Sequence, residues 1–152
     1  MSDLFRTKPP APVAARRRAP LTTETLKSSA VTVGALAGVM VVLQVLNSLT
    51  GAALVQNLGI HPRSGDGLLG IVFAPLLHGG IGHLVANTVP LLVLGFLILL
   101  SGVARWLAVT AIVWIVGGLG TWLTGGFNTL HLGASVLVFG WLGYLLLRGV
   151  FS

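Results

Sequence analysis

The chain has 152 residues, of which 55% are hydrophobic and only 8% charged. Its mean hydropathy of +0.96 excludes an ordinary soluble domain and is typical of a protein with several membrane-spanning helices. Nine Lys and Arg residues against three acids give a net charge of +6. Most of these cations precede the first apolar run, which favours an orientation signal at an anionic lipid surface over a nucleic-acid groove. They are Arg6, Lys8, Arg16, Arg17, Arg18 and Lys27.

The N-terminal residues 1–27 have few large apolar side chains and include four prolines and an arginine triplet. Such a segment cannot bury enough surface to fold by itself, so we predict a disordered, basic, cytoplasmic tail. The absence of cysteine excludes disulfides and thiolate metal sites. The lipid bilayer is an expected partner, nucleic acid is not, and the sequence leaves the oligomeric state open.

Residues 28–152 are predicted to form the membrane domain. The first apolar segment, residues 30–55, is long enough for a spanning helix. Proline, glycine and charged residues predict a loop between residues 56 and 70. Residues 68–77 are predicted to form a partly buried lead-in, that is, a short segment that precedes a second helix at residues 82–100. This second helix contains Pro90.

A turn at residues 101–105 leads to a third predicted helix at 103–123, and a glycine-containing break at 124–129 separates it from a fourth at 133–151. The predicted fold class is therefore all-α, a polytopic bundle with four transmembrane helices. Small residues are expected where membrane helices pack closely. The candidates are Gly34, Gly38, Gly95, Gly117, Gly118, Gly120, Gly140 and Gly143.

The positive charges predict the orientation of this bundle. With the N-terminus in the cytoplasm, Arg105 and Arg148 also lie inside and only Arg63 lies outside, as the positive-inside rule requires. The arginine preference and the Ala-, Gly- and Val-rich helices suit a bacterial plasma membrane. This orientation places the polar residues at the starts of the second and fourth helices near the outer face.

Three of those polar residues form the candidate site. His83 and Asn87 are four residues apart and share one helix face, while Ser135 begins another helix. Polar side chains inside a membrane segment mark a candidate functional site. A serine facing hydrogen-bond donors suits acyl transfer, because its hydroxyl attacks a carbonyl and the donors stabilise the resulting oxyanion. A helix cap and interhelical polar contacts are the alternative interpretation.

The spacing His78-x-x-x-x-His83-x-x-x-Asn87, followed by Gly133-Ala134-Ser135, resembles the rhomboid intramembrane serine proteases. The likeness covers about residues 28–152. Further matches lie on the fourth helix, at Phe139, Gly143-Tyr144 and Arg148-Gly149.

The resemblance implies a six-helix core with a Ser-His dyad, no metal and no cofactor, cleaving transmembrane substrates near their outer ends. Carried over by position, Ser135 is the nucleophile, and His83 and Asn87 line the oxyanion hole. His78 corresponds to a histidine expected to have a local structural role. His131, four residues before the serine, is not expected to replace the dyad base because Gly133 lies between them.

The sequence departs from the family pattern at three points. The dyad histidine belongs to a sixth helix, so residues 28–152 are expected to be an incomplete rhomboid domain. Val136 stands where a glycine usually follows the serine, and the first loop holds Arg63 without the usual Trp-Arg pair. Two alternatives stay open: a non-catalytic rhomboid-like protein that binds transmembrane segments, and an unrelated membrane component such as a transporter or assembly subunit.

Overall fold

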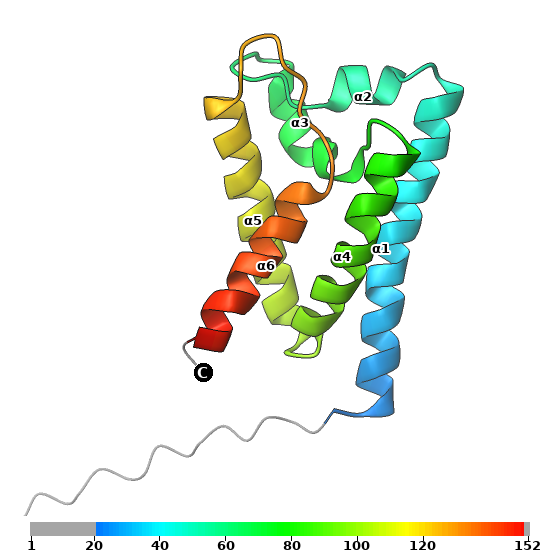
Figure 1. Ribbon diagram of the computed structural model, residues 1–152, viewed down its shortest axis with the longest axis vertical. Coiled ribbons are helices and arrows are strands. Elements are labelled where there is room, and N and C mark those ends of the chain that lie inside the picture. The colour runs from blue at the N-terminus through cyan, green and yellow to red at the C-terminus, as the bar shows by residue number, and fades with distance from the viewer. Residues whose placement is uncertain (1–20, 151–152) are drawn as a thin grey trace, which may run out of the picture.

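The computed structural model describes residues 21–150, so most of the predicted tail lies outside the described residues. The predicted all-α membrane bundle is confirmed (Figure 1). The only β pairing within residues 21–150 is an isolated antiparallel bridge between Ile60 and His131. The helices are α1 (Thr23–Leu49), α2 (Ala53–Leu58), α3 (Gly67–Phe73), the 3-10 helix η1 (Ala74–Leu76), α4 (Ile81–Leu99), α5 (Val103–Thr124) and α6 (Ser135–Val150).

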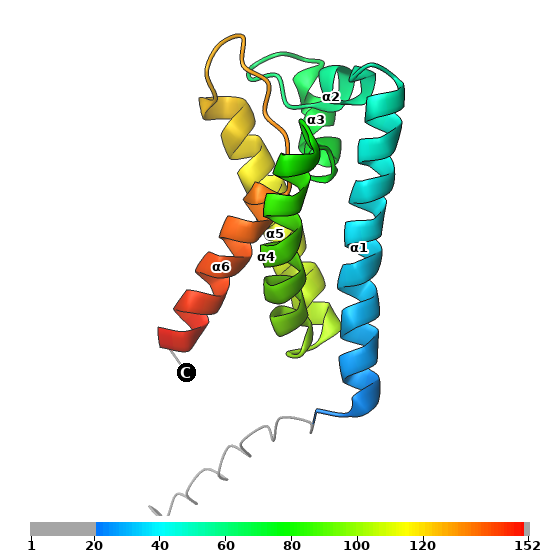
Figure 2. The same ribbon diagram turned by 45° about the vertical axis from the view of Figure 1, so that its right-hand side comes forward.

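Three of the described helices, α1, α4 and α5, are long and apolar enough to cross a membrane, and α6 is apolar but shorter, with 16 residues. Helix α1 packs along α4, and α6 packs against both α4 and α5. Figures 1 and 2 show α2 and α3 gathered at the end of the bundle where α6 begins, away from the start of α1. We call this the α6-start end.

The first helix differs from its prediction at both ends. The Thr22 side chain caps α1, so the last residues of the predicted tail are helical. The predicted end near residue 55 is wrong, because Gly51 and Ala52 adopt positive φ angles of 64° and 69° and turn the chain into the separate helix α2. The Asn47 side chain accepts the Val55 N–H at 3.0 Å and fixes this turn.

The other spanning segments lie close to their predicted positions. The predicted bounds of α4, α5 and α6 are confirmed to within two residues, and α4 continues through Pro90. The predicted loop at 56–70 is partly wrong, since its ends belong to α2 and α3. The lead-in is confirmed as α3 and η1, and Trp114 of α5 holds it by donating its indole N–H to the Ile71 carbonyl at 2.9 Å.

The core lies where α1, α4, α5 and α6 meet, and glycines allow its closest contacts. A Cβ on Gly95 of α4 would lie 2.8 Å from the buried Trp141 ring and 2.9 Å from Val33. A Cβ on Gly140 of α6 would overlap the Val113 side chain of α5. A Cβ on Gly117 would overlap Val136 of α6, and a Cβ on Gly118 would overlap Ile71 of α3. The prediction is wrong for four glycines, where a Cβ would meet nothing within 4 Å among the described residues: Gly34, Gly38, Gly120 and Gly143.

Gly140→Ala is expected to destabilise the α5–α6 interface, because the β-branched Val113 side chain can move little to accept a new methyl group. Overpacking of this kind costs about 1–3 kcal/mol. Thermal unfolding in detergent should show a lower Tm for Gly140→Ala than for Gly143→Ala, the matched control on the same helix. Equal Tm values would contradict this packing, and Val113→Ala should restore part of the loss in Gly140→Ala.

Candidate functional site

The candidate site is organised by the segment that leads into α6. Ile60 and His131 exchange two backbone hydrogen bonds of 2.8 and 3.0 Å. Gly133 N–H then donates to the Ala74 carbonyl at 2.8 Å, and Ala134 N–H donates to Nε2 of His78 at 3.3 Å. The non-helical segment 131–134 is therefore held by residues from the α2–α3 loop, η1 and the turn before α4.

Gly133 brings the predicted site residues of two helices together. Its φ of +107° favours glycine, and a Cβ there would lie 2.7 Å from both Cε1 and Nε2 of His83. The same Cβ would lie 3.8 Å from Nδ2 of Asn87. The imidazole and the amide of α4 therefore both face the backbone two residues before Ser135.

Two contacts orient the polar residues of α4. The His78 and His83 rings meet edge to face, with their centroids 5.1 Å apart. The Asn87 amide is buried and donates to the His83 carbonyl at 3.0 Å. One N–H of this amide is thus used within the helix, and the second forms no hydrogen bond with the described residues.

Ser135 is the first residue of α6, so its backbone N–H has no acceptor within the helix. Together with Gly133, Val136 and His131 it lines a small cavity of about 110 Å³. Its hydroxyl forms no hydrogen bond with any part of residues 21–150. His131 also lines this cavity, and its Nε2 lies 2.8 Å from the Thr129 hydroxyl.

Val136, which stands where the rhomboid pattern usually has glycine, packs against Gly117 of α5. A Cβ on Gly117 of α5 would overlap Cγ2 of Val136. The Val136 side chain therefore fits against α5 because Gly117 has no side chain. It also forms part of the cavity wall beside Ser135.

The first loop is anchored by aromatic residues from a distant part of the chain. The Arg63 guanidinium lies 3.9 Å from the centroid of the Phe127 ring and donates to the Leu123 carbonyl at 2.8 Å. The Trp122 indole donates to the Ser64 carbonyl at 2.9 Å. Sequence reasoning missed these contacts, because nothing local to the loop indicates partners about 60 residues away.

His78 is a buried structural residue, and it is 1% exposed. Burial, and to a smaller extent the neighbouring His83, lower the pKa of its imidazole to about 4, while the Leu76 backbone opposes the shift. Because Nε2 accepts the Ala134 N–H, Nδ1 carries the proton of the neutral ring. Nδ1 itself meets no partner of hydrogen-bond geometry among the described residues.

No metal centre is indicated in residues 21–150, where no three His, Asp or Glu side chains gather into a possible metal site. Ser135, His83 and Asn87 instead offer a hydroxyl and hydrogen-bond donors, which suit attack on a carbonyl and stabilisation of an oxyanion.

Comparison with known proteins gives a consistent family match. A family model described as a rhomboid domain matches residues 66–152. Uncharacterized proteins of Mycobacterium bovis and Mycobacterium tuberculosis are each 53% identical over 114 residues, which cover 72% of this chain and 47% of theirs. An uncharacterized protein of Mycobacterium leprae is 48% identical over 126 residues, covering 80% and 50%. The chain thus spans about half the length of these curated relatives. No solved structure gives a significant match.

The lowered pKa of His78 predicts a pH-dependent stability. Between pH 6.5 and about 4 the unfolded chain binds a proton that the folded chain does not, so the free energy of unfolding should fall as pH decreases through this range. His78→Gln keeps an acceptor for Ala134 N–H but removes the titration. Unfolding in detergent at several pH values should show a shallower decline for this variant, and identical declines would contradict the assignment.

Proposed function

The chain belongs to the rhomboid family of membrane proteins, and from this premise we propose that it supplies the nucleophile and oxyanion site of an intramembrane serine endopeptidase. The observation that carries the proposal is the meeting of His83 and Asn87 with Gly133, immediately before the first residue of α6. Ser135 is the proposed nucleophile, and transmembrane proteins are the proposed substrates.

The proposed reaction proceeds by acyl transfer. The Ser135 hydroxyl attacks the scissile peptide carbonyl while a general base takes its proton. The tetrahedral intermediate expels the amine product, which receives the proton, and leaves an ester on Ser135. Water then hydrolyses the ester and releases the new carboxylate. The base is proposed to be the dyad histidine that the family resemblance implies on a later helix, since His78 and His131 already use their Nε2 atoms.

The oxyanion would be stabilised by groups already held in place. The backbone N–H of Ser135 is free of intrahelical bonds, and the positive end of the α6 dipole lies at the same point. The second N–H of the Asn87 amide and the His83 ring add donors from α4. Because these donors belong to packed helices, they need little reorganisation as the charge develops.

The proposed setting is a bacterial plasma membrane with the N-terminus in the cytoplasm. The positive charges support this orientation, because those of the tail, Arg105 and Arg148 then lie inside. The mycobacterial origin of the relatives supports the bacterial membrane. In this orientation the α6-start end faces outward, so substrates would be cut near the outer ends of their spanning segments.

Ser135→Ala in the full-length protein is expected to abolish cleavage of a transmembrane reporter, because no acyl-enzyme can form. It should also abolish labelling by a fluorophosphonate. Ser48→Ala is the matched control, since the Ser48 hydroxyl bonds only within α1. Retained cleavage in Ser135→Ala would refute the proposal. Absent labelling of the unmodified protein with intact binding of transmembrane segments would favour the non-catalytic alternative.

Asn87→Ala and His83→Ala are expected to lower kcat by about 10²–10³ each, the usual cost of removing one oxyanion donor, with a smaller effect on KM. Thr88→Val is the control, because it removes a neighbouring hydroxyl that bonds only to the Leu84 carbonyl. Steady-state kinetics with a reporter peptide in detergent separates the two constants. Unchanged kcat values would remove these side chains from the oxyanion site.

A further inference from the structure

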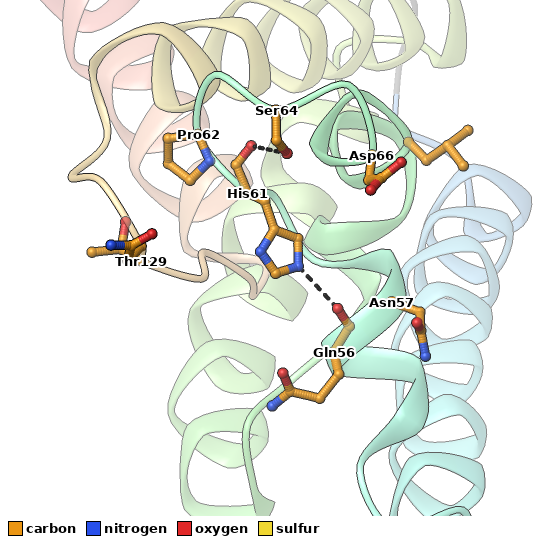
Figure 3. A pocket seen from close by; sticks show the side chains of 9 residues that line it. Gln56, Asn57, His61, Pro62, Ser64, Asp66 and Thr129 are labelled. Carbon is orange, nitrogen blue, oxygen red and sulfur yellow. Dashed lines mark hydrogen bonds between the residues drawn. The ribbon is translucent and has the colours of Figure 1, made fainter.

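We propose that a second, polar pocket at the α6-start end binds a Lys or Arg side chain in the extramembrane segment of the substrate, which rests on the protease function proposed above. This pocket, drawn in Figure 3, has a volume of about 550 Å³, and none of its lining residues lines the cavity at Ser135. It is built from α2, the α2–α3 loop, the start of α3 and the α5–α6 loop. Its lining residues are Gln56, Asn57, His61, Pro62, Ser64, Asp66, Leu69, Asn128 and Thr129.

The charge of the pocket comes from Asp66. This carboxylate lines the pocket and makes no ion pair within residues 21–150. The nearest cation in sequence, Arg63, does not neutralise it, because its guanidinium lies over Phe127 and bonds to the Leu123 carbonyl. The pocket therefore presents an uncompensated negative charge in an otherwise basic protein.

The neutral groups of the pocket match the donors of a basic side chain. The side-chain amides of Gln56 and Asn128 have no hydrogen-bond partner among the described residues. Their two side-chain carbonyl oxygens therefore add neutral acceptors to the pocket that Asp66 charges, and a lysine ammonium carries three N–H donors for such groups. A guanidinium can use the same acceptors through its planar set of N–H groups.

The pocket wall is already fixed before any ligand binds. His61 Nε2 lies 2.9 Å from the Gln56 carbonyl, and the Ser64 hydroxyl donates to the His61 carbonyl at 3.1 Å (Figure 3). Gly67 N–H donates to that same hydroxyl at 3.0 Å. These bonds hold the loop, so binding needs little ordering of the backbone.

The polar pocket and the Ser135 cavity are lined by nearby stretches of the chain. Ile60 and His131, the two bridged residues, line the Ser135 cavity. His61, which follows Ile60, and Thr129, two residues before His131, line the polar pocket. Ser135 lies six positions after Thr129 in the sequence. Six residues of chain span at most about 21 Å, at about 3.5 Å per residue, so an extended substrate needs no more than about six residues to reach from the cleaved bond to Thr129.

Asp66→Asn is the informative change, because Asp66 makes no capping hydrogen bond to α3 and the substitution removes only its charge. The full-length protein should be assayed with paired reporters that carry Lys or Gln at one extramembrane position. Asp66→Asn is expected to raise KM for the Lys reporter by about three- to tenfold, to leave KM for the Gln reporter unchanged, and to leave kcat unchanged for both.

Glu24→Gln is the matched control, since it removes an exposed acid at the start of α1, at the opposite end of the bundle. It should change neither constant. Asp66→Lys should reverse the preference and favour a reporter with Glu at the same position. Equal effects of Asp66→Asn on the Lys and Gln reporters, or no effect on either, would overturn the inference.

Binding to Ser135→Ala separates this inference from the protease proposal. Crosslinking of the two reporters to Ser135→Ala, with and without Asp66→Asn, measures recognition without turnover. A Lys preference that Asp66→Asn removes supports the pocket whatever the cleavage assays show. Equal crosslinking of both reporters overturns the pocket, while loss of cleavage in Ser135→Ala alone would still support the protease.

Discussion

The candidate site depends on the hydrogen bonds that fix the backbone of residues 131–134. This segment is not helical, and it leads directly into the first residue of α6. In a membrane, non-helical backbone is tolerated only where protein or trapped water satisfies its polar groups. Ile60, Ala74 and His78 provide that satisfaction, and in doing so they set the position of Ser135.

The same requirement explains why the α2–η1 region is folded back into the bundle. Its backbone, together with the buried imidazole of His78 just after η1, provides the hydrogen-bond partners of residues 131–134. Trp114 of α5 connects α3 to the spanning helices. Gly133 completes the arrangement, because its positive φ and missing side chain let the His83 ring approach the chain. Several elements distant in sequence are thus needed to place one serine and its proposed donors.

Two departures from the family pattern, Val136 and the loop with Arg63, are accommodated by contacts with neighbouring residues. The Val136 side chain packs against Gly117 of α5, where a residue with a side chain would overlap it. Arg63 lacks a tryptophan in its own loop but lies over Phe127, and Trp122 holds the adjacent backbone. Asp66, which follows three residues after Arg63, makes no ion pair among the described residues and lines the proposed polar pocket.

The sequence by itself determined the apolar segments, the bounds of α4 and α5, and the shared face of His83 and Asn87, because helical periodicity and turn residues act over a few positions. Only the tertiary structure decided that α1 ends at Leu49, that Gly95 and Gly140 are packed while Gly143 is open, and that His78 meets Ala134. These features depend on which helix lies opposite each residue. Local patterns along the chain carry no information about a partner that is 56 residues away.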